Sequence, residues 1–393
     1  MDQPKWYTCT PVRFSGDETF FARDSGLLCK GFQEIGAGGQ AIMPGPAMEG
    51  DCAQDLIRIP YKNLENPAWW KSLGGCGVVF YGWGLGRYVP IVKAIRTAGL
   101  HLVTNMDTAG FLSPVTGSIP FLRALCTRLG NEQAPLLSFV RIAFKAVTAF
   151  SWGILHNDPG WLKHFSFADA VAAVSPIGVD RIRRFCLFYG RKDLAQKIHL
   201  IPHPVSHKMT YEGSPKENRV VAIGRWDTIQ KDPVLLKKTI LYCLEYNPEI
   251  RFVIYGKMSV QLQKDLAFIA HQHSGRVVLG GVVPNAQLAP ILQTSQILLC
   301  TSRHESFHIA SAEALCCGCS VVGPDVQDAP AMPWFATEPH GRLAARNPIA
   351  MGQAVLDESG AWKAGKRNPS IISTTWKARV SAPQVAKQII ELF

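Results

Sequence analysis

The sequence lacks several features that would assign it to other classes of protein. Residues 1–15 contain no apolar run of the kind that forms the core of a signal peptide. No basic segment is interleaved with aromatic residues, as nucleic-acid-binding segments are, and no Asp-x-Asp metal motif occurs. Internal repeats and low-complexity tracts are also missing. The sequence therefore predicts an ordinary globular protein of the cytoplasm, without a metal centre or a nucleic-acid partner.

Charged residues are few as well, at 18% of the 393 residues, whereas 47% are hydrophobic. This balance is normal for a soluble α/β protein, and the length predicts two domains. The net charge of +11 favours acidic partners, such as a nucleotide or an anionic lipid. The eleven cysteines have no regular spacing, so reduced thiols are expected. Cys316, Cys317 and Cys319 have no partner pair at zinc-site spacing and are predicted to be small buried hydrophobes.

The strongest functional signal is a pair of carboxylates, Glu305 and Glu313. The apolar run 297–300 before them predicts a buried strand, and a helix of small residues that ends near Gly318 follows Glu305. This order places Glu305 in a loop at the carboxyl end of a parallel sheet and Glu313 about one turn into the helix. Ligands of open α/β sheets bind at that edge, and a helix N-terminus attracts anions. The pair therefore favours a ligand with both hydroxyls and phosphate, such as a nucleotide diphosphate sugar.

A second segment carries two cations on one loop. The apolar run 220–223 predicts a strand, and Gly224, Arg225 and Lys231 follow it before a helix that contains Pro233 in its first turn. Gly224 permits a tight turn, whereas a guanidinium and an ammonium together suit a pyrophosphate. The two cations would also stabilise the charge that builds on a departing phosphate.

Taken together, the two segments resemble the retaining glycosyltransferases of family 4, which have the GT-B architecture. The similarity rests on Gly-Arg-(x)5-Lys at 224–231 and Glu-(x)7-Glu at 305–313. The resemblance implies an α/β fold with two Rossmann-like domains that face a central cleft. It implies an acceptor-side domain over 1–205, a nucleotide-sugar domain over 206–373, and a C-terminal helix over 374–393 that packs back on the first domain.

The resemblance also implies roles for individual residues. Arg225 and Lys231 would bind the donor diphosphate, Glu305 the hydroxyls of the transferred sugar, and Glu313 the ribose hydroxyls. The other donor-binding residues it implies are Gly16, Gly224, Ser306, Phe307, His308 and Ile309. His308 replaces the glycine usual in the family, and its side chain would narrow the sugar pocket.

The first domain supplies candidates for the remaining roles. A strand over 5–10, a loop that contains Gly16 and a helix over 18–35 are expected at its start, and a plain turn glycine is the alternative for Gly16. Family members commonly have a histidine in a later loop, where this sequence has Asp107. Asp107 is ranked first as a contact to a sugar hydroxyl or as a catalytic base, and His156 is the second candidate. A structural role remains open for both.

A glycine-rich loop gives a competing prediction. Gly82, Gly84 and Gly86 follow the predicted strand 78–81, and Asp107 lies about twenty residues later, as in dinucleotide-binding proteins. The third glycine falls one position early, so an NAD-type Rossmann oxidoreductase is the alternative rather than the main prediction. A GT-B protein that binds a nucleotide sugar without catalysis is a third possibility.

Residues 135–155 form a strongly apolar stretch, interrupted mainly by Arg141 and Lys145. The favoured prediction is a helix packed inside the first domain. The alternative is a set of basic amphipathic helices over 119–155 that lie on an anionic bilayer. A membrane span is disfavoured because both cations fall near the centre of the stretch.

The sequence thus predicts a retaining, metal-independent hexosyltransferase. It would move a hexose-like sugar from a UDP or GDP donor to a glycan or a lipid-linked acceptor, in polysaccharide or glycolipid biosynthesis. No cofactor is expected beyond the nucleotide sugar. The predicted location is the cytoplasm, and peripheral attachment to the inner face of the membrane is the alternative.

Overall fold

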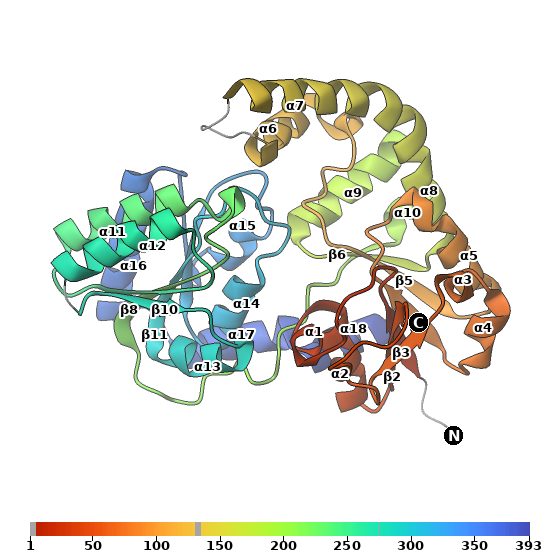
Figure 1. The fold of residues 1–393 in the computed structure, drawn as a ribbon, viewed down its shortest axis with the longest axis horizontal. Helices are drawn as coiled ribbons and strands as arrows, with labels where there is room; N and C mark the ends of the chain where they lie inside the picture. Colours follow the sequence, from red (N-terminus) through yellow and green to blue (C-terminus); the bar gives the residue numbers. More distant parts are fainter. Residues whose placement is uncertain (1–4, 130–134, 274) are drawn as a thin grey trace. The chain divides into compact units, whose positions relative to one another are not determined.

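The computed structural model describes residues 5–129, 135–273 and 275–393, and its contacts divide the chain into two compact units (Figure 1). The first unit comprises the chain up to Ser206 together with Arg379–Phe393, and the second comprises His207–Ala378. The limits suggested from the sequence, 205 and 373, lie close to these. Each unit contains one parallel sheet with helices, so the predicted α/β class is confirmed.

A parallel sheet of seven described strands forms the centre of the first unit, in the order β3-β2-β1-β4-β5-β6-β7. The strands are β1 (Trp6–Cys9), β2 (Gly38–Pro44), β3 (Leu56–Ile59), β4 (Gly77–Phe80), β5 (His101–Met106), β6 (Ala170–Ala173) and β7 (Ile198–Leu200). The chain reverses its direction of progress across the sheet between β1 and β4. Ligands of open α/β sheets bind beyond the carboxyl ends of the strands at such a reversal.

Successive side chains of β1 point to opposite faces of this sheet, and both faces are covered by helices. Tyr7 and Cys9 belong to one buried core, which also contains side chains of α5 (Val89–Thr97), α8 (Asp158–Phe167) and α9 (Pro176–Phe188). Trp6 belongs to the opposite core, with side chains of α2 (Asp24–Glu34) and α18 (Ala382–Ile390). The remaining described helices of the unit are α1 (Glu18–Phe21), α3 (Tyr61–Leu64), α4 (Pro67–Ser72), α6 (Ser118–Leu129), α7 (Pro135–Thr148) and α10 (Lys192–Gln196), with the shorter turns η1 (Gly86–Tyr88) and η2 (Pro114–Thr116) and the π-helical segment η3 (Ala149–Asn157).

The stretch 374–393, predicted as one helix, contains the end of one helix, which stops at Val380, and the separate helix α18. Helix α18 packs against α2 within the first unit. The contact is close because Gly31 of α2 has no side chain. A Cβ atom at Gly31 would lie 2.4 Å from the backbone oxygen of Ala382. Val205 and Ser381 form a parallel bridge beside this contact. The chain therefore leaves the first unit once and returns to it.

The single helix predicted over 18–35 was wrong. The structure has two helices there, because α1 ends at Phe21 and α2 begins at Asp24. Asp24 has a φ of 50°, in the left-handed region, which a continuous right-handed helix does not allow. Aspartate is one of the few residue types that adopt this conformation readily.

The second unit is built on a parallel sheet of six described strands, in the order β10-β9-β8-β11-β12-β13. The strands are β8 (Glu217–Ile223), β9 (Arg251–Tyr255), β10 (Val277–Gly281), β11 (Ser295–Leu299), β12 (Ser320–Pro324) and β13 (Gly341–Ala344). Its chain reversal lies between β8 and β11. The two sequence motifs follow β8 and β11, so they begin at the edge where ligands of such sheets bind.

Seven described helices accompany this sheet in the second unit. They are α11 (Pro233–Tyr246), α12 (Val260–Gln272), α13 (Asn285–Thr294), α14 (Ile309–Cys316), α15 (Met332–Phe335), α16 (Pro348–Lys363) and α17 (Pro369–Val380), with the short turn η4 (Ile229–Lys231). Cys316, Cys317 and Cys319 are fully buried free thiols, which confirms their prediction as small core residues.

The segment from α6 to η3, hereafter the arm, does not pack inside the first unit (Figure 1). The helical run Leu136–Phe167 is long and apolar enough to cross a membrane, yet only 11% of its apolar window is buried. The favoured prediction of a packed internal helix was therefore wrong. Of the predicted stretch 119–155, residues 130–134 lie outside the described residues.

Candidate active site

The two motif loops of the second unit lie side by side because β8 and β11 are neighbouring parallel strands. Val220 pairs with Ile297, and Val221 pairs with Leu298. The loop that follows β8 carries Gly224, Arg225 and Lys231, and the loop that follows β11 carries Glu305. Both loops therefore leave the same edge of the sheet.

Hydrogen bonds fix the two loops to one another. The backbone amide of Arg303 donates to the carbonyl of Gln230 at 2.8 Å. The side-chain amide of Gln230 donates to the carbonyl of His304 at 3.1 Å. Thr301 donates from its hydroxyl to the carbonyl of Lys231 at 2.7 Å. The loops therefore form one framework, which holds the Lys231 backbone against the glutamate loop.

Lys231 and Glu305 meet in this framework. The Lys231 Nζ atom lies 2.5 Å from Oε1 of Glu305, and the two side chains are only 15% and 11% exposed. Burial alone would raise the pKa of the Glu305 carboxyl. The Lys231 ammonium in contact with this carboxylate outweighs that effect, so the pKa of Glu305 lies below its usual range. The site therefore holds an ionised carboxylate beside a cation.

Asp232 supports this arrangement and was not predicted as a site residue. Its φ is 51°, and its carboxylate caps α11 by accepting from the amide of Leu235 at 3.2 Å. The same carboxylate pairs with Arg303 at 3.3 Å and with Arg346. An acid at the position before Pro233 is a sequence signal for a helix cap, and it could have identified Asp232.

Close backbone contact shapes the start of the cationic loop. Gly256 has a φ of 114°, and a Cβ atom there would lie 1.8 Å from the carbonyl oxygen of Gly224. A Cβ atom on Gly224 would lie 3.3 Å from the Lys231 side chain. Gly256 thus lets β9 approach the loop, and it was also missed from the sequence. Arg225 leaves the same loop with an exposed side chain.

His308 stands at the N-cap of α14 with a φ of 70°. A left-handed backbone explains why glycine suits this position and why histidine, which tolerates the conformation better than most residues, can replace it. The ring is buried, and its Nδ1 lies 2.6 Å from the hydroxyl of Ser311. Burial and the Lys231 charge lower the pKa of His308 to about 3, so the ring is neutral at pH 7.

The other predicted donor-binding residues occupy the first part of α14 and the turn before it. Glu313 is buried and accepts a hydrogen bond from Asn285 Nδ2 at 2.8 Å. The Phe307 ring is buried against Phe335, with centroids 5.1 Å apart. The Phe307 side chain therefore belongs to the core of the unit, and a contact between Phe307 and the donor stays a prediction. Ser306 and Ile309 are partly exposed on either side.

In the first unit, Asp107 belongs to a group that the sequence did not suggest. The Nε2 atom of His203 lies 3.1 Å from Oδ1 of Asp107, and its Nδ1 atom lies 3.5 Å from Oδ1 of Asp24. The His203 side chain is 3% exposed, whereas those of Asp107 and Asp24 are 37% and 42% exposed. Burial disfavours the charged ring, but the two carboxylates outweigh burial and raise the pKa of His203 to about 9. A buried imidazolium thus holds two partly exposed carboxylates.

Gly16 is buried in the first unit, and its surroundings favour a structural role. Its amide donates to Asp51 Oδ1 at 2.9 Å, and a Cβ atom there would lie 2.2 Å from Leu56. Asp51 also pairs with Arg58 at 2.7 Å. The amide is therefore already engaged within the unit, and a contact between Gly16 and the donor phosphate stays a prediction.

The glycines of the competing loop are explained by packing. A Cβ atom on Gly84 would lie 2.5 Å from the sulfur of Met106, and one on Gly86 would lie 2.8 Å from Gly160 of α8. These contacts need glycine whether or not a dinucleotide binds. His156, the second candidate base, is exposed on the arm and stacks on Trp152 with ring centroids 3.6 Å apart.

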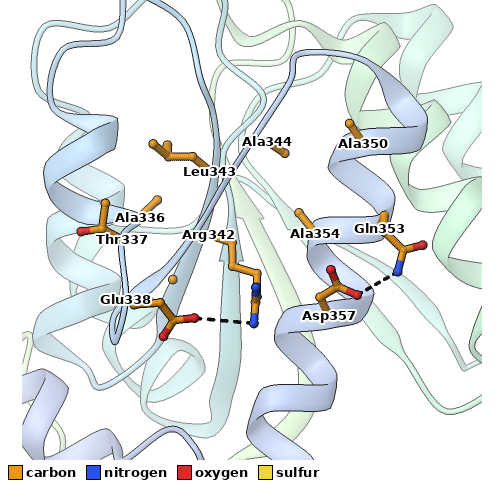
Figure 2. A pocket seen from close by; sticks show the side chains of 11 residues that line it. Ala336, Thr337, Glu338, Arg342, Leu343, Ala344, Ala350, Gln353, Ala354 and Asp357 are labelled. Carbon is orange, nitrogen blue, oxygen red and sulfur yellow. Dashed lines mark hydrogen bonds and ion pairs between the residues drawn. The ribbon is translucent and has the colours of Figure 1, made fainter.

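Other features of the described residues do not extend the site. No cluster of three or more potential metal ligands occurs among them. Figure 2 shows a surface pocket of about 550 Å³ that is lined by residues of β13 and α16. Its charged side chains are matched internally, since Arg342 lies 3.5 Å from Glu338 and Gln353 donates to Asp357 at 2.8 Å. None of the predicted site residues lines this pocket.

Comparison of the sequence with known families identifies the region that contains the two motifs. Residues 217–357 match the family of glycosyl transferases group 1. One of the subunits of phosphatidylinositol N-acetylglucosaminyltransferase from Arabidopsis thaliana is 29% identical over 138 residues, which are 34% of this chain and 31% of the relative. The match thus spans about a third of that protein's length.

Solved structures with a similar fold cover nearly the whole chain. HepE of Anabaena, in complex with UDP, has a TM-score of 0.61 and 14% identity, with 98% of each chain covered. Sucrose-phosphate synthase of Thermosynechococcus elongatus has a TM-score of 0.59 and 14% identity, with 99% of this chain and 98% of that chain covered. At such identities the similarity establishes the fold. Residues 217–357 are thus similar to the glycosyl transferases group 1 family, and the two Rossmann-like units have the GT-B fold of these solved structures.

Proposed function

We propose that the protein is a retaining glycosyltransferase that moves a hexose-like sugar from a nucleotide diphosphate donor. The observation that supports this most directly is the contact between Lys231 and Glu305, at 2.5 Å on adjacent loops of the second sheet. One ligand with a diphosphate next to a sugar would meet both groups. The position of these two side chains therefore suits a nucleotide diphosphate sugar, the donor that the family resemblance implies.

Charge stabilisation is the chemistry that these residues offer. Lys231 and Arg225 would bind the diphosphate and stabilise the negative charge that develops as it leaves. The N-terminus of α14 adds the positive end of a helix dipole. The proposal therefore assigns to protein groups the neutralisation that a divalent metal performs in other transferases, and it needs no cofactor.

The carboxylates are assigned to the hydroxyl groups of the donor. Glu305 would accept hydrogen bonds from the transferred sugar, and the Lys231 contact keeps it ionised for that purpose. Glu313, oriented by Asn285, would accept from the ribose. His308 would limit the space beside the sugar because it places a buried ring where glycine is usual. Uridine is the preferred base in this proposal, since HepE was solved with UDP and with UDP-glucose.

The acceptor side is assigned to the first unit. Asp107 would bind the acceptor hydroxyl or take its proton, with His203 holding its carboxylate in place. A glycan or a lipid-linked sugar fits this role. The proposed location is the cytoplasm, extended to the inner face of a membrane because the arm is apolar, cationic and exposed. Such a transferase would serve polysaccharide or glycolipid synthesis.

A thermal-shift panel tests donor binding. UDP-glucose, UDP-N-acetylglucosamine, GDP-mannose and NAD would be added separately, and a ligand that binds only the folded state raises the melting temperature. We expect a rise with a UDP-sugar that is lost in Glu305→Gln. A rise with NAD alone would support the oxidoreductase instead.

Slow release of UDP from the donor without an acceptor separates an enzyme from a binding protein. We expect the wild type to release UDP and Lys231→Ala to release almost none. The anomeric form of the released sugar, read by proton NMR before mutarotation, tests retention. An inverted product would contradict the retaining assignment while leaving the donor site intact.

A further inference from the structure

The arm of the first unit exposes an unusual number of large apolar side chains. Figure 1 shows α6 and α7 next to each other, with the chain continuing from α7 toward α8. Exposed fractions reach 77% for Leu136, 68% for Phe139 and 64% for Phe144 on α7. They reach 63% for Trp152 and 70% for Leu155 on η3. Soluble surfaces rarely present such a concentration of apolar side chains unless something covers them.

The charge of the arm indicates what covers it. Arg123, Arg128, Arg141 and Lys145 are exposed there. The described arm residues, 118–129 and 135–157, include neither Asp nor Glu. Apolar side chains combined with cations of one sign are the pattern of segments that bind anionic lipid surfaces.

The base of the arm is fixed to the first unit, which leaves its outer part to meet a partner. Asp158 accepts hydrogen bonds at 2.6 Å from both Ser113 and Tyr189. His164 lies 3.1 Å from the hydroxyl of Thr104 and 3.1 Å from the carbonyl of Leu85. These contacts hold α8 against the sheet, so α8 does not enter a bilayer with the arm.

Two observations favour a position along the bilayer surface over a membrane span. Arg141 lies in the middle of α7 and Lys145 in its last turn, so both interrupt the apolar helical run Leu136–Phe167, where a spanning helix would place them in hydrocarbon. Phe121 of α6 packs edge-on against Phe150 of η3, with centroids 6.3 Å apart. The arm is therefore a double layer of helices that can lie flat while its cations reach the headgroups.

We infer that the arm inserts its apolar side chains into the interface of an anionic bilayer and thereby directs the transferase to a lipid-linked acceptor. This inference rests on the proposed function for its choice of acceptor. The arm begins in the chain shortly after Asp107, the proposed acceptor-binding residue at the end of β5. A bilayer that held the arm would therefore be close to that end of the first sheet.

Vesicle binding with paired variants tests the inference. The full-length protein would be sedimented with vesicles of phosphatidylcholine alone and with vesicles of phosphatidylcholine and phosphatidylglycerol in equal parts. We expect Phe144→Asp to weaken binding to the anionic vesicles roughly tenfold or more. The control is Phe268→Asp on α12 of the second unit, because both phenylalanines are 64% exposed on a helix. The control is expected to bind like the wild type.

A second pair tests the charge. Lys145→Glu should weaken binding roughly tenfold, and raised salt should weaken the wild type, whereas Lys264→Glu on α12 should leave binding unchanged. Equal binding to neutral and anionic vesicles would overturn the role of the cations. No binding by the wild type, or self-association in solution that Phe144→Asp abolishes, would overturn the inference and identify a second copy of the chain as the partner.

The donor assay keeps this inference separate from the proposed function. Phe144→Asp should retain the thermal shift with a UDP-sugar, because the donor residues lie in the second unit. Vesicle binding without a thermal shift from any nucleotide sugar would support membrane binding by the arm and contradict the proposed transferase. A thermal shift without vesicle binding would contradict only membrane binding by the arm.

Discussion

Each unit buries one histidine beside its proposed site, and the two rings have opposite charge states. His203 in the first unit faces the carboxylates of Asp107 and Asp24, and its pKa is raised to about 9. His308 in the second unit faces Lys231 and Ser311, and its pKa is lowered to about 3. Both rings are almost completely buried. Burial favours the neutral form of both rings: Lys231 adds to its effect at His308, whereas the two carboxylates outweigh it at His203.

The same contrast separates the chemistry of the two units. The second unit gathers cations and would receive an anionic donor, whereas the first unit offers two carboxylates and would receive hydroxyl groups. In each, the histidine stabilises the arrangement around it. A neutral ring beside Lys231 avoids a second buried positive charge, and a charged ring beside Asp107 balances two negative ones.

The largest effect is expected from the cations of the second unit. Lys231→Ala should lower transfer on the order of a hundredfold or more, because it removes a group that stabilises the departing diphosphate. Arg225→Ala should cause a loss of the same order. Initial rates with a saturating UDP-sugar would measure both.

Lys238→Ala is the matched control, since Lys238 is exposed on α11 outside both motif loops. It should leave the rate unchanged within about twofold. Rates within about threefold of wild type for both Lys231→Ala and Arg225→Ala would remove the basis for the donor site. A circular-dichroism spectrum would show that each variant is folded.

The next effect distinguishes the two candidate bases of the first unit. Asp107→Asn should lower kcat about tenfold to a hundredfold, because it removes the negative charge that binds the acceptor or accepts its proton. His156→Ala should change kcat by less than about twofold, since His156 is exposed on the arm and lies against the Trp152 ring. A soluble acceptor keeps membrane binding out of the measurement. The reverse ranking would move the base to the arm.

Sequence patterns predicted the second unit better than the first, for a physical reason. Strand β8, its cationic loop and α11 are neighbours in sequence, as are β11, its glutamate loop and α14. Local hydrophobic patterns and cap residues therefore predict both segments. The order in which β8 and β11 pair is not local, but the reversal rule of α/β sheets places their loops together.

The group around His203 could not be predicted in this way. Its members come from three distant segments, at Asp24, Asp107 and His203, and only the folded sheet brings them together. The broken helix at Asp24 had no sequence signal stronger than the apolar pattern that continues through it. The arm was misassigned because a core helix and a bilayer-surface helix have the same apolar pattern and differ only in what covers them.

The dependence of stability on pH distinguishes the two histidines. The alkaline limb of this curve, which reports on His203, should show the larger loss of stability. His203 has a folded pKa of about 9 against about 6.5 when unfolded, so its contribution is complete below pH 6.5 and disappears as the pH rises through 9. We expect a loss of about 2 kcal/mol between pH 6 and pH 9.5, after allowance for the partial exposure of both carboxylates. Urea unfolding at each pH would measure it.

His203→Gln should flatten this alkaline limb, because the ring that loses its proton is gone. The variant should also be less stable than wild type at pH 6, where two carboxylates are left without their cation. An alkaline limb that persists unchanged in His203→Gln would assign the loss to another group.

The smallest effect is the acid limb of His308, and its sign is opposite. The folded pKa of His308 is about 3, so the ring is neutral in the folded protein while the unfolded chain binds a proton below about pH 6.5. Stability should therefore fall by about 1.5 kcal/mol between pH 6.5 and pH 5. Asparagine tolerates the left-handed backbone, so His308→Asn should reduce this acid limb and leave the alkaline limb of His203 in place. An acid limb of the same sign should remain, because burial also lowers the pKa of His164, to about 4. Loss of both limbs in the one variant would mean that the two histidines titrate together, and the division into an anion-binding unit and a hydroxyl-binding unit would lose its electrostatic basis.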